Sequence, residues 1–185
     1  MKIISGYRGG QFIKVPKTIK VRPTTGKSKE GIFNILNNNF DFENLKVLDL
    51  FSGTGNISYE FESRGANVTS IDNNMNTVKF LKKESNDLKL DICAVKSDVF
   101  NYIKNTNQRF DIIFADPPYN FSKSEYLNII SIIFYKNLLK IDGIFLLEHS
   151  SQNDFLNHDN FYETRKYGGC FFSFFKNIND WFPIF

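Results

Sequence analysis

From residue 45 onward, strand-like runs alternate with segments of helical length, and this alternation constrains the fold more than any other feature. The expected strands cover residues 46–51, 67–71, 91–95, 110–115 and 143–148, and the expected helices cover 56–64, 74–88, 98–104 and 123–139. Strands separated by helices form βαβ units, which build a parallel sheet with both faces covered. Two last runs, residues 161–167 and 170–176, predict an antiparallel hairpin added to that sheet.

The first 40 residues follow another pattern. Residues 2–5 and 11–15 are apolar runs on either side of a glycine-rich turn, which predicts a small β-hairpin. A helix is expected to begin near Thr25 and to end in Asn37-Asn38-Asn39. A length of 185 residues suits one compact domain. We therefore expect a single domain over 1–185, with a hairpin-and-helix extension (1–40) attached to an open α/β core (41–185).

Charge is distributed unevenly between these two parts. Residues 1–29 hold eight basic side chains and no acidic one, whereas the other 156 residues hold 15 basic and 20 acidic groups and sum to −5. A cationic segment on an acidic body favours contact with a polyanion, although a solvated charge run is the simpler alternative. The candidate contacts are Arg8, Lys14, Lys17, Lys20, Arg22, Lys27 and Lys29.

Several classes of protein do not fit this composition. No apolar run reaches the roughly 20 residues that span a bilayer, and the N-terminus lacks the apolar region of a signal peptide, so we expect a cytoplasmic protein without membrane contact. Cys93 and Cys170 stand in apolar, strand-like settings. They are interpreted as buried free thiols rather than a disulfide or half of a metal site. No set of metal ligands is visible.

The first strand of the core leads into a loop that suits ligand binding. Asp49 and Phe51 precede Gly53 and Gly55, and ligands of open α/β sheets bind beyond the carboxyl ends of the strands. The two glycines allow a sharp turn and a close approach of the backbone to a ligand. The third glycine of a dinucleotide fingerprint is replaced by Ser58, so a plain strand-to-helix turn remains possible.

Acidic residues end the next two strands. Asp72 stands where a carboxylate accepts hydrogen bonds from ribose hydroxyls, and Asp98 stands where an acid can hold an adenine amino group. Either residue could instead cap the helix that follows it. Together with Asp49, these residues outline a site for an adenosine-containing ligand.

The fourth strand ends in Asp116-Pro117-Pro118-Tyr119. The Asp116 carboxylate and the Pro117 carbonyl can accept the hydrogens of an amino group and stabilise positive charge that develops on its nitrogen. Two prolines fix the backbone around these acceptors, and Tyr119 can stack on a base. The alternative is a simple turn, since both dipeptides break strands. Behind a Gly-x-Gly loop, the tetrapeptide predicts methyl transfer to an exocyclic amino nitrogen.

The chain resembles the bacterial 16S ribosomal RNA guanine-N2 methyltransferase family, RsmD. The blocks that carry the resemblance run from the N-terminal loop to the last strand; they are Ile3-Ile4-Ser5-Gly6, Val21-Arg22-Pro23-Thr24-Thr25, Lys29-Glu30, Leu48-Asp49-Leu50-Phe51-Ser52-Gly53-Thr54-Gly55, Ser63-Arg64-Gly65-Ala66 and the tetrapeptide. The Arg-Pro-Thr-Thr block is the most specific of these. Gly26 replaces an acid that the family commonly has at this position.

The resemblance implies a Rossmann-like class I fold with a seven-stranded, mostly parallel sheet, and methyl transfer from S-adenosylmethionine to N2 of a guanine in 16S rRNA. It implies that the partner is 16S rRNA within the small ribosomal subunit. We expect the protein to be a monomer. The implied cofactor contacts are Asp49, Phe51, Gly53, Gly55, Asp72, Asp98, Val99, Thr24 and Thr25, and the acceptor contacts are Asp116, Pro117, Pro118 and Tyr119. Two alternatives remain open: an adenine-N6 DNA methyltransferase and an inactive RNA-binding module.

Overall fold

The computed structural model describes residues 1–19, 26–118, 120–167 and 169–177. Five of the residues predicted to bind cofactor, RNA or the acceptor base therefore lie outside the described residues; they are Lys20, Arg22, Thr24, Thr25 and Tyr119.

Five helices and seven strands are described, in an order close to the predicted one. The helices are α1 (Gly26–Asn37), α2 (Asn56–Ser63), α3 (Met75–Leu88), α4 (Val99–Asn105) and α5 (Lys123–Tyr135). The strands are β1 (Lys46–Leu50), β2 (Asn67–Asp72), β3 (Ile92–Lys96), β4 (Phe110–Ala115), β5 (Leu139–His149), β6 (Phe161–Tyr167) and β7 (Cys170–Phe175).

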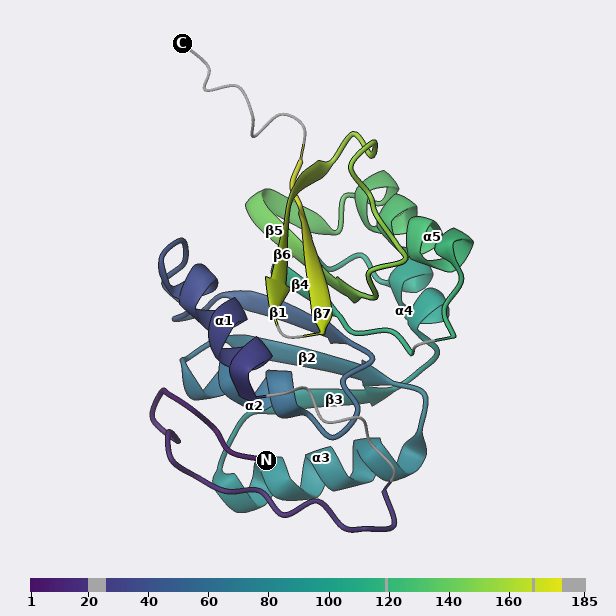
Figure 1. The fold of residues 1–185 in the computed structure, drawn as a ribbon. Coiled ribbons are helices and arrows are strands. Elements are labelled where there is room, and N and C mark those ends of the chain that lie inside the picture. The colour runs from purple at the N-terminus through teal and green to yellow at the C-terminus, as the bar shows by residue number, and fades with distance from the viewer. Residues whose placement is uncertain (20–25, 119, 168, 178–185) are drawn as a thin grey trace.

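The strands form one seven-stranded sheet in the order β3-β2-β1-β4-β5-β7-β6 (Figure 1). The five strands from β3 to β5 are parallel, and the hairpin of β6 and β7 joins the sheet antiparallel to β5. This arrangement confirms the predicted fold class. The strand order reverses at β1, whose neighbours are β2 on one side and β4 on the other. The carboxyl ends of these strands therefore flank the position where open α/β sheets bind ligands.

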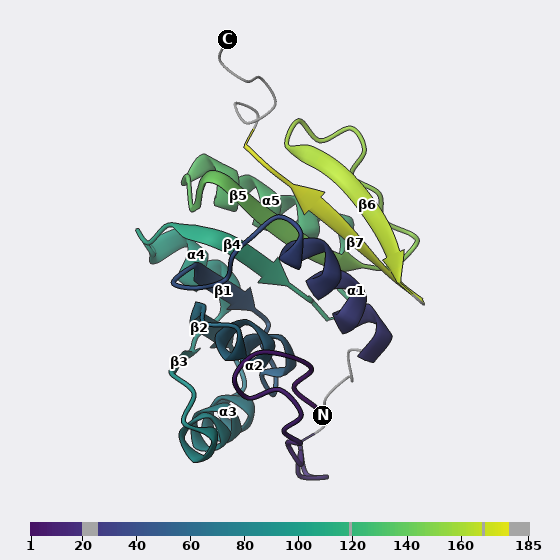
Figure 2. The same ribbon diagram turned by 90° about the vertical axis from the view of Figure 1, so that its left-hand side faces the viewer.

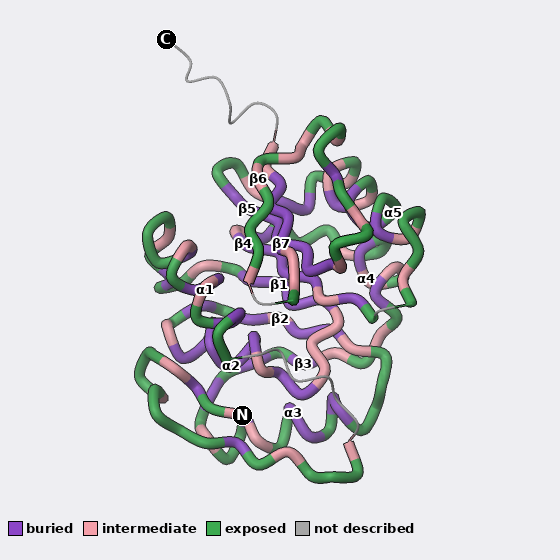
Figure 3. Tube along the Cα trace, viewed as in Figure 1, coloured by how far each residue is buried: buried purple, intermediate pink, exposed green. Residues whose placement is uncertain are grey.

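Helices cover both faces of the sheet. In Figure 2, α1, α2 and α3 lie on one side and α4 and α5 lie on the other. Each layer has its own apolar core; the first includes Phe33, Phe61 and Phe172, and the second includes Ile130 and Phe145. Alternate residues of the central strands enter the two cores, so these strands are buried on both faces, as Figure 3 shows. Phenylalanine side chains, which are abundant in this chain, thus fill much of both apolar cores.

Local signals in the sequence fix where the helices begin. Ser122 and Glu125 form a reciprocal capping box at the start of α5, and the Asn74 side chain accepts a hydrogen bond from the Asn76 backbone at the start of α3. The C-terminus of α5 differs from the prediction, because the helix ends at Tyr135 and β5 already begins at Leu139.

The N-terminal extension has less regular structure than predicted. One isolated antiparallel bridge, between Lys2 and Phe12, stands in place of two strands. The pairing is short because the following backbone turns to α2: the Tyr7 N–H donates to the Ser63 carbonyl at 2.7 Å, and the Ser63 hydroxyl donates to the Ser5 carbonyl at 2.7 Å. The loop is therefore held by α2 as well as by backbone hydrogen bonds between its own arms, such as the one from the Ile3 N–H to the Gln11 carbonyl at 2.9 Å.

Cys93 is exposed, which corrects the prediction that it is a buried thiol. It lies on β3, the edge strand of the sheet, where every second residue lacks a cover. Within the described ranges, no helix has the length and apolar character to cross a membrane.

Candidate active site

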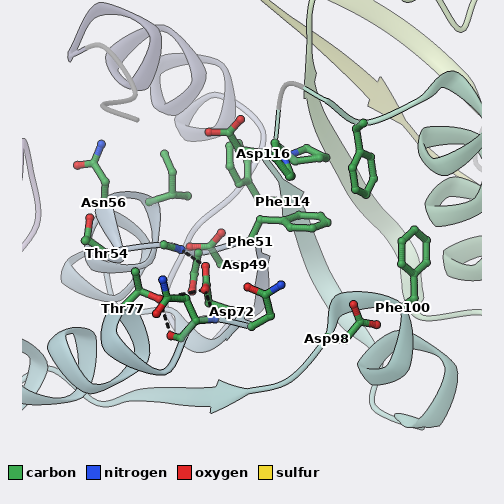
Figure 4. A pocket seen from close by; sticks show the side chains of 18 of the residues that line it. Asp49, Phe51, Thr54, Asn56, Asp72, Thr77, Asp98, Phe100, Phe114 and Asp116 are labelled. Carbon is green, nitrogen blue, oxygen red and sulfur yellow. Dashed lines mark hydrogen bonds between the residues drawn. The ribbon is translucent and has the colours of Figure 1, made fainter. Parts of the chain in front are cut away.

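A cavity of about 640 Å³ lies at the carboxyl ends of β1, β2 and β4 and the start of α4. Its walls include most of the predicted cofactor and acceptor residues, namely Asp49, Phe51, Gly53, Asp72, Asp98, Asp116, Pro117 and Pro118. In Figure 4, Asp49 and Asp72 lie in the middle, between Thr54 and Asn56 on one side and Asp98 and Phe100 on the other. The structure thus brings the two predicted groups into one cavity, while their binding roles stay predictions.

The loop after β1 owes its shape to left-handed backbone conformations. Phe51, Gly53 and Gly55 have φ angles of 61°, 53° and 87°. A side chain at Gly55 would place its Cβ 2.5 Å from the Leu81 side chain, so this glycine permits the packing of the loop on α3. Gly55 itself is buried and does not line the cavity. The structure gives Gly55 a packing role, and its contact with the cofactor stays a prediction.

Asp72 holds this loop in place. Its Oδ2 accepts a hydrogen bond from the Gly53 backbone N–H at 2.8 Å, and its Oδ1 accepts from the Asn74 backbone N–H at 2.8 Å and from the Thr77 hydroxyl at 2.9 Å. A carboxylate offers about four lone-pair positions, so one remains for a ligand. Asp72 is therefore both a structural anchor and a possible acceptor for a ligand hydroxyl.

Asp49 is buried, and the Ser58 hydroxyl donates a hydrogen bond to its carboxylate. Ser58 also shares a hydrogen bond of 2.7 Å with the Ser70 hydroxyl. Removal from water raises the pKa of Asp49 to about 7; the Ser58 hydrogen bond lowers it, and the charge of Asp72 raises it. A cationic group bound next to Asp49 would favour its ionised form.

Asp98 serves two purposes at the other end of the cavity. One carboxylate oxygen accepts a hydrogen bond from the Asn101 backbone N–H at 2.9 Å and thereby caps α4. The side chain is exposed and lines the cavity, so its second oxygen is open to a ligand. The Val99 side chain is buried in the core and Phe100 stands on the cavity wall, so any contact of Val99 with the cofactor would use its backbone and stays a prediction.

Phe100 and Phe121 complete the wall beside the predicted Phe51, and these two aromatic residues were not predicted from the sequence. Phe121 stacks on Phe100 with ring centroids 6.0 Å apart and meets Phe51 edge-on at 5.4 Å. The Phe121 backbone N–H also donates to the Pro118 carbonyl at 3.0 Å, which closes the turn after the tetrapeptide. Phe121 therefore links the acceptor segment to the adenine end of the predicted cofactor site. The available signal was its position, two residues after Tyr119.

The basic residues of the N-terminal extension do not share one environment. Lys14, Lys17 and Lys27 are exposed, whereas Arg8 is half-buried and its guanidinium lies 5.4 Å from the Tyr7 ring. The prediction that Lys29 contacts RNA is wrong. Its side chain is 4% exposed, and its ammonium is 2.7 Å from the Glu60 carboxylate, so it is paired inside the protein.

His149 lies outside the site. It is buried next to Phe155, and its Nε2 is 2.8 Å from the Ser173 hydroxyl. Burial lowers its pKa, which favours a neutral, packed ring. In the part of the chain that the structure describes, no group of three or more His, Cys, Asp or Glu side chains could hold a metal ion.

Comparison with known proteins shows to which family the chain belongs. The family model described as "Conserved hypothetical protein 95" matches residues 1–176. The ribosomal RNA small subunit methyltransferase D of Buchnera aphidicola subsp. Baizongia pistaciae is 28% identical, and the match covers 97% of this chain and 93% of that protein.

Solved structures agree with the fold. A hypothetical protein of Thermus thermophilus has a TM-score of 0.82 at 22% identity, over 96% of this chain and 99% of that one. A T. thermophilus 16S rRNA N2 methyltransferase, in complex with AdoMet and guanosine, has a TM-score of 0.64 at 21% identity, over 83% and 43% of the two chains. The protein therefore belongs to the "Conserved hypothetical protein 95" family and has the fold of the S-adenosylmethionine-dependent methyltransferases.

Proposed function

We propose that this protein transfers a methyl group from S-adenosylmethionine to the exocyclic N2 of a guanine in 16S ribosomal RNA. The observation that carries the proposal is the shared cavity: Asp49, Asp72 and Asp98 line it from one side, and Asp116 with Pro117 lines it from the end of β4. A donor bound by the first group would present its methyl group to an acceptor held by the second.

The described residues fit this cofactor. S-adenosylmethionine, when bound, supplies a methyl group activated by a sulfonium. Asp72 has a free lone-pair position for the ribose hydroxyls, Asp98 has a second oxygen for the adenine amino group, and Phe100 offers a ring for the adenine to contact. Asp49 is buried beneath the middle of the cavity and suits a positively charged group of the methionine part, such as its ammonium. Gly53 lets the backbone approach without a side chain.

Asp116 and Pro117 would hold the acceptor. A carboxylate oxygen and a carbonyl oxygen accept the two amino hydrogens, which directs the nitrogen lone pair toward the methyl group and stabilises the charge that develops on nitrogen. The prolines and the Phe121–Pro118 hydrogen bond at 3.0 Å preorganise this segment. Such positioning can supply roughly 7–11 kcal/mol of the barrier reduction. Tyr119, outside the described residues, remains the proposed stacking partner of the guanine.

The RNA would reach the site along the N-terminal extension. Exposed cations at Lys14, Lys17 and Lys27 suit phosphate groups, and Arg8, Lys20 and Arg22 are further candidates from the sequence. A guanine must leave its stack to enter the cavity, which favours an unpaired nucleotide. We propose that the protein works in the cytoplasm as a single-domain monomer on the small ribosomal subunit.

Guanine in 16S rRNA is preferred as the acceptor for two reasons. The relative from Buchnera aphidicola, which matches over nearly its whole length, is named for methylation of the small-subunit rRNA. The sequence also carries the Arg-Pro-Thr-Thr block that resembles the guanine-N2 family. The tetrapeptide by itself serves adenine equally well.

The test is methylation of isolated small subunits, naked 16S RNA and duplex DNA with labelled S-adenosylmethionine, followed by mass spectrometry of the nucleosides. We expect N2-methylguanosine from the ribosomal substrates. Label found only in DNA would support adenine-N6 transfer instead. If calorimetry detects no cofactor binding at high protein concentration, the protein is an inactive module and the proposal fails.

A further inference from the structure

Lys29 lies in the first turn of α1, and its buried ammonium binds three acceptors on two segments of the chain, the N-terminal loop and α2. It donates to the Lys2 carbonyl at 2.7 Å, to Asn56 Oδ1 at 3.0 Å and to Glu60 Oε1 at 2.7 Å. An ammonium has three N–H donors, so all of them are used. The side chain thus joins α1 to the N-terminal loop and to α2, both at the first residue of α2, on the rim of the cavity, and at its middle.

Glu60, the anion of this pair, is fully buried on α2 and has three donors of its own. Its Oε1 also accepts the Ile4 backbone N–H at 2.6 Å, and its Oε2 accepts the Arg64 guanidinium. Arg64 in turn lies over the Phe33 ring of α1, 4.3 Å from its centroid. Lys29 and Glu60 therefore bind the N-terminal loop on both sides of Ile3, through Lys2 and Ile4.

Asn56 connects this network to the cavity. Because an ammonium can only donate, the amide atom that faces Lys29 is the oxygen, and the NH₂ group remains as a donor. Asn56 lines the same cavity as Asp49 and Asp72. Lys29 thus fixes the orientation of a cavity donor without touching the cavity itself.

We propose that Lys29 is a positioning residue that holds two parts of the enzyme at once: the N-terminal loop of residues 2–17, which faces RNA, and the Asn56 amide, which faces the cofactor. The proposal rests on the proposed function for the identity of these two ligands. One buried contact then sets the basic loop and the cofactor cavity relative to each other.

The arrangement differs from an ion pair that only adds stability. Two of the three acceptors of Lys29 are neutral groups on separate segments, and a hydrophobic side chain of the same size could hold neither of them. Buried ion pairs are weak evidence for stability but can define a unique arrangement of the groups around them. Here that arrangement includes the cavity rim, so loss of Lys29 is expected to change ligand affinity as well as stability.

The proposed effect of Lys29 on cofactor binding is tested by calorimetry on Lys29→Met, Asn56→Ala and the double variant, with Lys83→Met as the matched control. Lys83 lies on α3 with an exposed ion pair to Asp87 at 3.0 Å. We expect each single change to raise the Kd of S-adenosylmethionine about tenfold, the effect of one lost charge-assisted hydrogen bond. The double variant should be no worse than either single one, because both changes remove the same contact. Additive losses of affinity, or an unchanged Kd in Lys29→Met, would overturn the proposed effect of Lys29 on cofactor binding.

Asn56→Asp separates the two halves of the amide. It keeps an oxygen for Lys29 but removes the NH₂ donor, so we expect it to lose affinity as Asn56→Ala does. Wild-type affinity in Asn56→Asp would show that the donor is not used. Lys29→Arg keeps the charge, and partial rescue is expected there even if Lys29→Met does not fold.

The proposed effect of Lys29 on the N-terminal loop is measured by hydrogen exchange, which needs no ligand. The Ile4 amide should exchange faster in Lys29→Met than in Lys83→Met, because Glu60 loses the ammonium that holds it in place. The KM for RNA should rise together with this exchange rate. If Lys29→Met lowers only the melting temperature, and both exchange and KM keep their wild-type values, the role of Lys29 is purely structural. Failure of the proposed function would instead appear as wild-type protein that binds no cofactor or methylates no 16S RNA.

Discussion

The Gly53 backbone N–H donates a hydrogen bond to the Asp72 carboxylate at 2.8 Å, so the loop after β1 is held by the acid that ends β2. Gly53 follows β1 and Asp72 ends β2, and because these neighbouring strands are parallel, the glycine loop and the acid meet at the carboxyl edge of the sheet. The predicted ribose acceptor is therefore also the residue that shapes the loop beneath the cofactor.

Replacing Asp72 with Ala removes both functions. A hydrogen bond to a charged group contributes about 1.5–3 kcal/mol, so cofactor affinity should fall roughly 10- to 100-fold. Isothermal titration calorimetry measures the change. Asp87→Ala is the control, since Asp87 forms only an exposed pair with Lys83 on α3. Equal affinities for the two variants would contradict the assignment of Asp72.

Replacing Asp116 with Ala should abolish methyl transfer and leave the Kd of S-adenosylmethionine within about twofold of wild type, because the acid binds the acceptor amino group. Asp116→Asn keeps one acceptor oxygen and should retain part of the rate. Single-turnover transfer and calorimetry on the same preparations separate the two effects. A loss of cofactor affinity in Asp116→Asn would show that this residue binds the cofactor and not the acceptor.

Asp49 should make the stability of the ligand-free protein depend on pH. Its pKa is raised from 3.8 to about 7, so the folded state binds the proton more tightly than the unfolded state does. Stability should therefore fall as pH rises from about 4 to about 7, by about 4 kcal/mol at most, and the cost is fully present above about 7.

Asp49→Asn tests this pH dependence because it cannot ionise. Urea unfolding at about pH 5 and about pH 8 should show a stability difference between wild type and variant that shifts in favour of the variant at the higher pH. A difference that is the same at both pH values would mean that Asp49 ionises at its ordinary pKa.

The exposed lysines of the N-terminal loop should determine the salt dependence of RNA binding. Each phosphate contact on single-stranded RNA contributes a slope of about 0.7, so the double change Lys14→Ala and Lys17→Ala should flatten the plot of log K against log salt by about 1.4. Filter binding at several salt concentrations gives the slope. Lys104→Ala, at the C-terminal end of α4, is the control. An unchanged slope would mean that this loop faces away from the RNA.

Phe12 should contribute to RNA affinity in a different way. Its side chain is 77% exposed in the same loop, and the Lys2 ammonium lies 5.4 Å from its ring centroid. A stacked base contributes about 1–3 kcal/mol, so Phe12→Ala should weaken RNA binding without changing the salt slope. Phe12→Tyr should retain the affinity. Wild-type binding by Phe12→Ala would leave the lysines as the only contacts of the loop.

Local patterns in the sequence were sufficient for much of the fold. Alternation of strand and helix predicted the parallel sheet, and the two last strand-like runs, residues 161–167 and 170–176, predicted the terminal hairpin. The same reasoning placed Asp72, Asp98 and Asp116 at strand ends. Carboxyl ends of parallel strands share one edge, so these residues had to meet once the strands paired.

The environment of other residues could not be predicted, because it depends on segments far away in the chain. Val99 and Phe100 are neighbours, but the direction of α4 sends the first into the core and the second to the cavity wall. Cys93 is exposed because β3 became the edge of the sheet, which no local pattern specifies.

Lys29 shows where the sequence and the tertiary structure divide. The sequence by itself determined that a basic residue stands in the first turn of a helix behind a cationic segment, together with the strands, the glycine loop and the strand-end acids. Only the tertiary structure decided that Glu60, 31 positions further on, meets this lysine in a buried contact of 2.7 Å. Charge is a property of the side chain, whereas burial and pairing arise when α1 and α2 pack on the same face of the sheet. A lysine expected on the RNA surface therefore lies inside the protein.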